Sequence, residues 1–261
     1  MKRIAVTALV SLLACGGGGR RVSAPVMLED EPAVAPAPTV PGGVAVTYLA
    51  ADGATIAATY WAPDRPSPGC AVFVHQLSST RAEWTPVVAG LRGHGHLLAI
   101  DLRGHGASTR GADGPLAWKA FATADWERVT DDVAAAIADL GARGAGPRCV
   151  VVGASIGSSA VLRLAGAAPE RVAAVVLLSP GLNYRGLATP DAARATRAPV
   201  LIVHSQEAGA VDAATALANI LREGQVEVEV VADPGTAHGM RIVAADPALV
   251  AKVVDFIGAH L

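Results

Sequence analysis

The sequence has few charged residues and no concentrated group of basic ones. Charged side chains make up 17% of the 261 residues, and the formal net charge is −2. The lysines and arginines are scattered, which excludes the dense basic patch that nucleic-acid-binding proteins use to neutralise phosphates. No internal repeat occurs, and no apolar run reaches the roughly 20 residues that a membrane-spanning helix needs. The stretch of about 220 residues that follows the N-terminal segments is rich in Ala, Val, Leu and Gly, which is typical of a globular domain.

Residues 1–15 are predicted to be an export signal. Two basic residues precede an apolar run from Ile4 to Ala14, the layout of a secretory signal peptide. The run ends in residues 12–16 (LLACG), which resemble the lipobox of bacterial lipoproteins. That resemblance implies cleavage before Cys15 and attachment of lipid, such as palmitate, to this cysteine. The protein would then be anchored on the periplasmic side of a bacterial membrane, with the outer membrane favoured. An ordinary signal peptide with an incidental cysteine is the alternative.

Residues 16–43 are predicted to be a flexible tether. They include four consecutive glycines and five prolines, and they hold too little apolar surface to offset the entropy of ordering. Prolines also favour extended conformations, which suit a semi-rigid spacer. A plain disordered tail is the alternative. Residues 44–261 are enough for one domain with one substantial core.

The predicted domain alternates short apolar runs with helical patterns, which is typical of a mainly parallel sheet with helices on both faces. The first two runs flank a turn at residues 51–53 and are predicted to form an antiparallel hairpin. The eight predicted strands are Val44–Leu49, Thr55–Tyr60, Ala71–Val74, Leu97–Ile100, Val150–Val152, Ala173–Leu178, Val200–Val203 and Val226–Val231.

Helices are predicted from apolar residues that recur at intervals of three and four. One face is formed by Trp126, Val129, Val133, Ile137 and Leu140. A last helix is predicted to start with Asp246 as its N-cap and Pro247 at the first helical position.

The segment Gly153-Ala154-Ser155-Ile156-Gly157 follows an apolar strand and precedes a helical stretch. This is the G-x-S-x-G nucleophile elbow in the strand–turn–helix context that it requires. The turn projects the serine hydroxyl above the edge of the sheet, and its crowding explains the two glycines. Ser155 is therefore the predicted nucleophile.

A serine hydroxyl needs a neighbouring base to remove its proton. His238 lies in the loop after the last predicted strand and is followed by a glycine. A third motif, Asp-Leu-Arg-Gly-His-Gly, occupies residues 101–106. In order and spacing, these segments resemble the α/β-hydrolase family over about residues 44–261. The resemblance implies that His238 is the general base.

The family resemblance also predicts the architecture. It implies a mostly parallel eight-stranded sheet with helices on both faces. Only about 20 residues separate the sixth and seventh predicted strands, so little or no cap domain is expected. In relatives the Asp-Leu-Arg-Gly-His-Gly turn is mainly structural, although Asp101 and His105 also suggest a catalytic role.

The oxyanion of the transition state needs preorganised N–H donors. One expected donor is the backbone N–H of Ile156, directly after the nucleophile. The resemblance implies that Leu77 supplies the second, with Gln76 as the alternative. Relatives usually have glycine where this chain has Gln76.

The triad acid is where the sequence departs from the family. The position that carries the aspartate in relatives is Ala208. Glu207, one residue earlier and with a longer side chain, is the favoured substitute. Asp212 is expected to cap the following helix, and the loop after the sixth strand offers only Asn183. The absence of any functional acid is the remaining alternative.

Cys70 and Cys149 are left if Cys15 carries lipid, and an even pair in an exported protein suggests a disulfide. Both cysteines open predicted strands, which are sheet neighbours in the α/β-hydrolase topology. A bridge between them is therefore predicted, with two buried free thiols as the alternative.

The prediction for function is an exported, lipid-anchored carboxylesterase that hydrolyses small esters through an acyl-enzyme, without metal or other cofactor. His94 and His96 lie in a glycine-rich loop but lack further ligands at metal-binding spacing. A non-catalytic envelope protein with a degraded triad is one alternative. A peptidase or thioesterase on the same scaffold is another. The sequence predicts no nucleic-acid partner and gives no oligomeric state.

Overall fold

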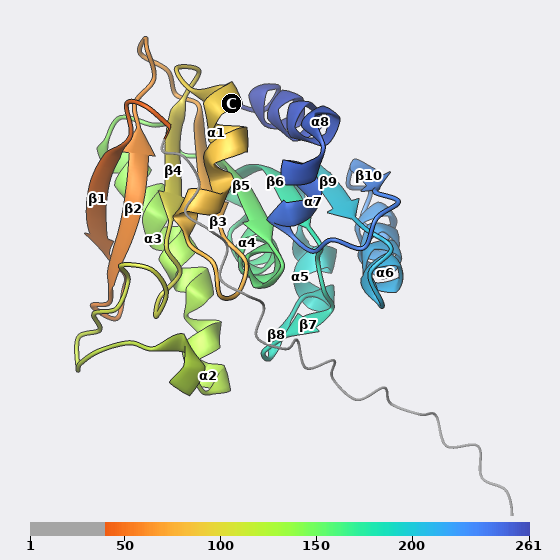
Figure 1. Cartoon of the computed structure of the whole chain (residues 1–261), viewed down its shortest axis with the longest axis horizontal. Coiled ribbons are helices and arrows are strands. Elements are labelled where there is room, and N and C mark those ends of the chain that lie inside the picture. The colour runs from red at the N-terminus through yellow and green to blue at the C-terminus, as the bar shows by residue number, and fades with distance from the viewer. Residues whose placement is uncertain (1–39) are drawn as a thin grey trace, which may run out of the picture. The chain divides into compact units, whose positions relative to one another are not determined.

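The computed structural model describes residues 40–261 (Figure 1). The predicted signal peptide, the lipid site Cys15 and most of the predicted tether lie outside the described residues, so they stay predictions. Among residues 40–261, none of the helices is both long and apolar enough to cross a membrane.

An eight-stranded sheet forms the centre of the described domain. Its strands are β1 (Val44–Leu49), β2 (Thr55–Trp61), β3 (Cys70–Val74), β4 (His96–Ile100), β5 (Cys149–Ala154), β6 (Val172–Leu178), β9 (Val200–His204) and β10 (Val228–Ala232). The spatial order is β1-β2-β4-β3-β5-β6-β9-β10. Strands β1, β2 and β4 pair antiparallel, and all other neighbours pair parallel. The predicted α/β-hydrolase fold is confirmed.

Helices cover both faces of this sheet. They are α1 (Thr85–Leu91), α2 (Thr123–Glu127), α3 (Val129–Ala142), α4 (Ile156–Ala167), α5 (Pro190–Ala195), α6 (Ala210–Glu223), α7 (Met240–Ala245) and α8 (Pro247–Gly258). Side chains of α1, α7 and α8 pack into one hydrophobic core, and those of α3 to α6 pack into another on the opposite face. Strands β3, β4, β5 and β9 are buried along their whole length. Their continuous apolar sequence follows from burial on both faces.

The segment between β6 and β9 contains no large cap. It holds helix α5 and a small hairpin of β7 (Asn183–Tyr184) and β8 (Leu187–Ala188). The predicted start of α8 is confirmed, because Asp246 accepts a hydrogen bond from the Ala248 N–H at 2.8 Å. The expectation that Asp212 caps α6 is wrong: the N-cap is Gly209, with φ +80°, and Asp212 lies in the first turn.

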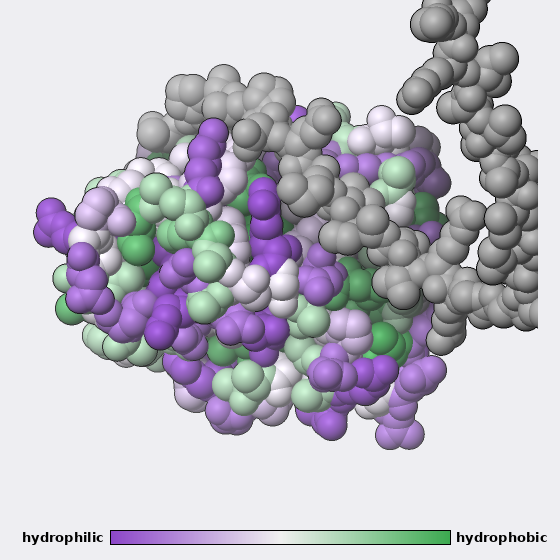
Figure 2. Space-filling model, turned by 90° about the horizontal axis from the view of Figure 1, so that it is seen from below, coloured by the Kyte–Doolittle hydropathy of each residue, from purple (hydrophilic) through white to green (hydrophobic). Residues whose placement is uncertain are grey.

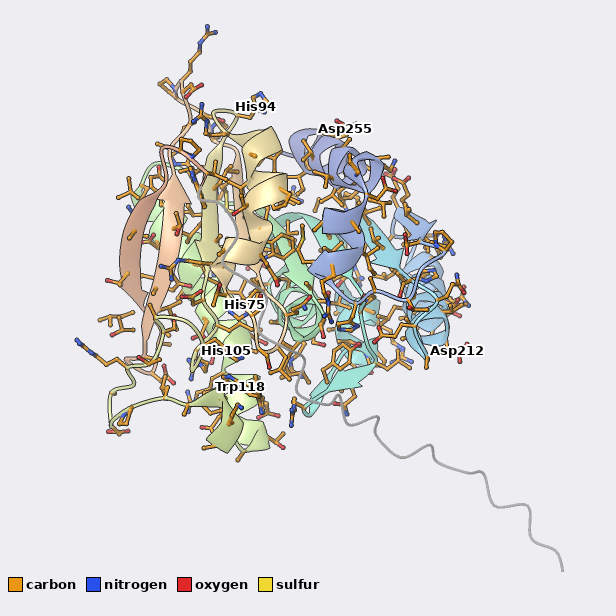
Figure 3. The ribbon with its side chains drawn as sticks, in the orientation of Figure 1. His75, His94, His105, Trp118, Asp212 and Asp255 are labelled. Carbon is orange, nitrogen blue, oxygen red and sulfur yellow. A yellow bond between two sulfur atoms is a disulfide. The ribbon has the colours of Figure 1, made fainter. Side chains whose placement is uncertain are left out.

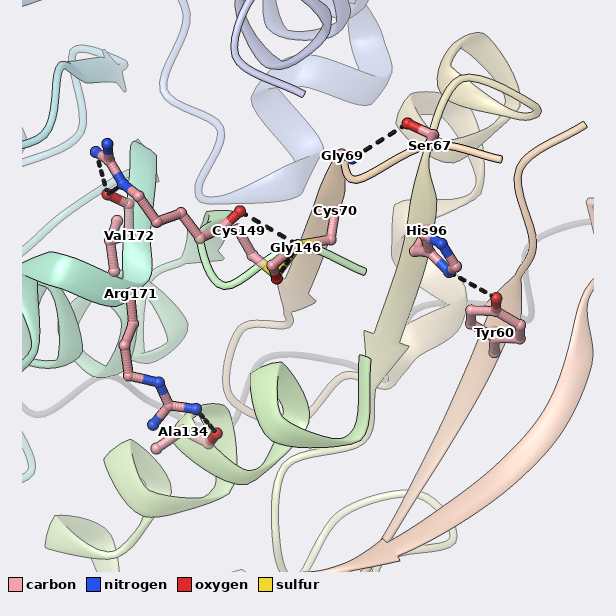
Figure 4. Close-up of a disulfide and its surroundings, with 11 residues drawn as sticks. Tyr60, Ser67, Gly69, Cys70, His96, Ala134, Gly146, Cys149, Arg171 and Val172 are labelled. Atoms are coloured by element: carbon pink, nitrogen blue, oxygen red, sulfur yellow. Dashed lines mark hydrogen bonds between the residues drawn. A yellow bond between two sulfur atoms is a disulfide. The ribbon is translucent and has the colours of Figure 1, made fainter. Parts of the chain in front are cut away.

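Cys70 and Cys149 form a disulfide (Figure 4). They are the first residues of β3 and β5, which are parallel neighbours, and their Cα atoms are 4.7 Å apart. The bridge links positions 79 residues apart in the sequence. It lies at the amino ends of these strands, so it is remote from the edge of the sheet where Ser155 is located.

Removing this disulfide should destabilise the domain substantially. A cross-link that closes a loop of about 80 residues lowers the entropy of the unfolded chain, which corresponds to roughly 4 kcal/mol of stability. We expect the Cys70→Ala/Cys149→Ala variant to lose about that much in urea unfolding. Reductant should shift the wild-type midpoint and leave that of the variant unchanged. A wild-type midpoint that is insensitive to full reduction would contradict this expectation.

Candidate active site

Ser155 occupies a sharp turn between strand β5 and helix α4. Its backbone has φ +52° and ψ −116°, a conformation that costs energy for a residue with a side chain. A Cβ on Gly153 would lie 2.3 Å from the Gly157 carbonyl oxygen, and one on Gly157 would lie 2.3 Å from the Val74 oxygen. The two glycines of the motif are therefore required by the close approach of backbone on both sides of the serine.

Neighbouring hydrogen bonds hold this turn in place. The Ser155 N–H donates to the Leu178 carbonyl at 2.8 Å. The Ser158 hydroxyl donates to the carbonyl oxygens of Gly153, at 2.8 Å, and Leu178, at 3.0 Å. Hydrogen bonds to the end of β6 and from Ser158 of α4 thus stabilise the strained backbone of Ser155.

His238 is paired with Glu207. Its Nδ1 lies 2.5 Å from Glu207 Oε2, and its side chain is 5% exposed against 27% for the glutamate. A carboxylate accepts hydrogen bonds, so Nδ1 carries a proton in this pair, and in the neutral imidazole Nε2 then has the lone pair. Nε2 is buried and has no hydrogen-bond partner among residues 40–261. This is the protonation pattern that a general base needs.

Two loops bring this pair together at the carboxyl ends of the strands. Glu207 follows β9, and its N–H donates to Ser205 Oγ at 3.1 Å. The Gln206 N–H donates to the Gly235 carbonyl at 2.7 Å, which joins the loop of Glu207 to the loop of His238.

The same histidine loop lies against the nucleophile elbow. The Gly239 N–H donates to Ser179 Oγ at 2.8 Å, and Ser179 directly follows the strand that holds the Ser155 N–H. A Cβ on Gly239 would be 3.6 Å from the Cβ of Ala154. The histidine loop therefore lies beside the loop that carries Ser155.

The other candidates for the acid are placed elsewhere. Ala208 is exposed and has no ionisable group, and Asn183 is exposed on β7. Asp212 is exposed on α6, at the side of the domain (Figure 3). Within the described chain, the carboxylate that bonds to His238 is that of Glu207.

The structure separates the two candidates for the second oxyanion donor. The Gln76 N–H donates to Glu83 Oε1 at 3.0 Å and is therefore occupied. The N–H groups of Leu77 and Ile156 donate no hydrogen bond to another residue of the described part. Ile156 is also the first residue of α4, where the helix dipole favours negative charge. Of the two candidates in the loop after β3, Leu77 is thus the one whose N–H stays available, as does that of Ile156.

The Asp-Leu-Arg-Gly-His-Gly turn is held by structural contacts. Arg103, 3% exposed, forms two hydrogen bonds with Asp132 (2.6 and 2.8 Å) and two with Asp52 (2.8 and 3.2 Å). It joins helix α3 to the β1–β2 hairpin. Asp101 accepts the backbone N–H groups of Arg81 and Ala107, each at 2.8 Å, and also pairs with the Arg81 guanidinium.

His105 and His75 are buried in this turn and the neighbouring loop. Burial lowers the pKa of His75 to about 4 and that of His105 to about 3, so both are neutral at pH 7. His75 Nδ1 bonds to the Gln76 carbonyl at 2.7 Å, and its Nε2 accepts the Leu102 N–H at 2.9 Å. His105 stacks on Trp118 with centroids 5.1 Å apart, below His75 in Figure 3. These contacts favour a structural role for both histidines.

The glycine-rich loop before β4 forms no metal site in the structure. His94 is exposed at the opposite end of the sheet (Figure 3), and His96 hydrogen-bonds to the Tyr60 hydroxyl at 2.8 Å. Across residues 40–261, no group of three or more His, Cys, Asp or Glu side chains is arranged to hold a metal ion.

The sequence did not predict that Tyr184 and Ser179 lie beside the histidine loop. The Tyr184 ring meets the imidazole edge to face, with centroids 6.4 Å apart, and its hydroxyl donates to the Ser179 carbonyl at 3.3 Å. Both residues belong to the segment after β6, where two-residue strands leave no periodic signal.

Figure 2 views the end of the domain at which the parallel strands terminate. Hydrophobic surface is exposed there between hydrophilic side chains.

This chain is similar in sequence and fold to known proteins. A family model described as the alpha/beta hydrolase fold matches residues 72–231. Lipase LipV of Mycobacterium tuberculosis is 34% identical over 149 residues, which are 56% of this chain and 52% of the lipase. The chain therefore aligns with about half the length of this relative.

Solved structures extend the likeness of the fold. An esterase of Pyrococcus furiosus superposes with a TM-score of 0.70 at 16% identity, covering 88% of this chain and 97% of the esterase. An enol-lactonase of Burkholderia xenovorans gives 0.66 at 16% identity, covering 81% and 99%. An esterase of Rhodococcus sp. gives 0.64 at 18% identity, covering 83% and 99%.

Proposed function

Since this chain belongs to the α/β-hydrolase family, we propose that it is a serine hydrolase that cleaves small carboxylic esters. The observation that carries the proposal is the His238–Glu207 pair, whose free Nε2 is buried beside the Ser155 elbow. The esterase and lipase names of its relatives support ester chemistry. The short segment between β6 and β9 favours small substrates that reach the site without displacing a large cap.

In the proposed first half-reaction, Ser155 Oγ attacks the ester carbonyl carbon and its proton passes to His238 Nε2. The carbonyl oxygen becomes an oxyanion, which the N–H groups of Ile156 and Leu77 stabilise. Glu207 stabilises the imidazolium that forms. When the tetrahedral intermediate collapses, the alkoxide leaves with the proton from Nε2, and the acyl group stays on Ser155.

Water completes the proposed cycle. His238 Nε2 takes a proton from the water as the water attacks the acyl carbon, and a second oxyanion forms in the same place. Its collapse breaks the bond to Ser155 Oγ, which recovers the proton from Nε2. The carboxylic acid is released and the enzyme returns to its starting state.

We also propose that the protein is exported and anchored by lipid on Cys15. The Cys70–Cys149 disulfide supports export, because disulfides persist mainly in oxidising compartments such as the periplasm. The lipobox-like residues 12–16 support the anchor.

Labelling with a fluorophosphonate probe tests the hydrolase proposal. The probe phosphonylates an activated serine, so we expect one label per folded chain, located on Ser155 by peptide mass spectrometry. Heat-denatured protein should not react. Ser67, which precedes β3 at the opposite end of the sheet, supplies a matched control, and the Ser67→Ala variant should label like wild type. Folded protein that stays unlabelled while a control esterase reacts would overturn the proposal and favour a non-catalytic role.

A further inference from the structure

Side-chain oxygens tie the start of α7, directly after His238, to two other loops of the site. The first N–H groups of a helix have no partner within it. The Gly239 N–H donates to Ser179 Oγ at 2.8 Å, and the Met240 N–H donates to Gln76 Oε1 at 3.0 Å. Both hydrogen bonds are buried, so the loops after β3 and β6 fix the point at which the histidine loop becomes a helix.

Gln76 is itself held firmly by its backbone. It is 2% exposed, and its N–H donates to Glu83 Oε1 at 3.0 Å. Its carbonyl accepts from the Ser79 N–H at 3.3 Å and from His75 Nδ1 at 2.7 Å. The amide that holds Met240 therefore extends from a fixed backbone.

The histidine loop is shaped to receive this amide. Gly239 has φ +58°, and a Cβ there would lie only 2.0 Å from Gln76 Oε1. Any side chain at this position would displace the glutamine. The glycine after His238 and the glutamine at position 76 are thus matched to each other.

We propose that Gln76 is a positioning residue for the hydrolase reaction. Its amide oxygen, together with Ser179 Oγ, fixes the α7 start and so holds His238 between Glu207 and Ser155. Gln76 also directly precedes Leu77, the proposed oxyanion donor, so it links the oxyanion loop to the general base. The inference rests on the proposed function.

Two substitutions of Gln76 distinguish the effect of its acceptor oxygen from the effect of its size. Gln76→Met keeps the length of the side chain but removes the acceptor oxygen, whereas Gln76→Glu keeps an acceptor in either protonation state. A misplacement of about 1 Å can cost roughly a hundredfold in rate. For hydrolysis of p-nitrophenyl butyrate, we expect kcat of Gln76→Met to fall about 10- to 100-fold while KM changes less than about threefold. Gln76→Glu should stay within about fivefold of the wild-type kcat, because it retains the acceptor.

The outcomes distinguish this inference from the proposed function. Wild-type protein that neither labels nor hydrolyses the ester would remove the proposed function itself. Active wild type with an equally active Gln76→Met variant would overturn the inference, as would equal losses in the Met and Glu variants. Thermal melts confirm that each variant is folded at the assay temperature. If Gln76→Met does not fold, Ser179→Ala removes the other hydrogen bond, and an unchanged kcat in that variant would also overturn the inference.

Discussion

Replacing Ser155 with alanine should lower ester turnover by about a millionfold, the scale of loss seen when the nucleophile of a serine hydrolase is removed. Alanine deletes the Oγ that forms the acyl bond, so the remaining donors can only polarise a carbonyl for attack by water. The substitution adds no atom to a turn that is already closely packed, so we expect the fold to persist. Initial rates with p-nitrophenyl butyrate, at enzyme concentrations high enough to detect slow turnover, measure the effect.

A matched alanine substitution makes this prediction specific. Ser67→Ala changes the same residue type at the far end of the sheet and should keep wild-type turnover. Ser155→Ala with more than about 1% of the wild-type kcat would show that another group attacks the ester, since a lost nucleophile leaves far less. The variant should also fail to react with the fluorophosphonate probe.

The sheet could be predicted from sequence because its signals are local. Each buried parallel strand is an uninterrupted apolar run, and the observed bounds differ from the predicted ones by at most two residues at each end. The nucleophile elbow could also be predicted from the sequence, because the crowding around Ser155 requires glycine on both sides. The hairpin β7–β8 was not predicted, because strands of two residues are too short to show alternation.

The contacts that complete the site join distant parts of the chain and leave no local pattern. The Gln76–Met240 hydrogen bond spans 164 residues, and the Gly239–Ser179 bond spans 60. Gln76 and Leu77, the two candidates for the proposed oxyanion donor, differ because the Glu83 carboxylate accepts the Gln76 N–H. Sequence alone identified the loop but could not show which N–H was already bonded.

The proposed triad acid illustrates the same limit. The resemblance to the family places the acid at Ala208, and the longer side chain of Glu207 makes that residue the favoured substitute. In the structure the loop after β9 turns so that Glu207 reaches the imidazole while position 208 is exposed. The Glu207 side chain, one methylene longer than that of aspartate, reaches the imidazole from one residue earlier. That contact depends on backbone geometry, which the spacing of residues does not determine.

Replacing Glu207 with glutamine should lower kcat by about 10³- to 10⁴-fold, as the loss of a triad acid does elsewhere. The amide has nearly the shape of the carboxylate, but its NH₂ group can donate to Nδ1 and so stabilise the tautomer that carries its proton on Nε2. That tautomer cannot accept the proton of Ser155. The amide also removes the negative charge that stabilises the imidazolium. We expect KM to change little, since Glu207 bonds to the imidazole and not to the ester in the proposed mechanism.

A neighbouring carboxylate provides the control. Asp212→Asn removes the same charge five residues later, on the exposed first turn of α6, and should leave kcat within about twofold of wild type, because exposed charges at a distance are screened. Comparable activity in Glu207→Gln and wild type would mean that His238 works without an acid, so that the 2.5 Å contact is only structural. A large loss in Glu207→Gln but not in Asp212→Asn would instead assign the third triad position to Glu207. The family's aspartate would then have been replaced one residue earlier, by a longer side chain on the same loop.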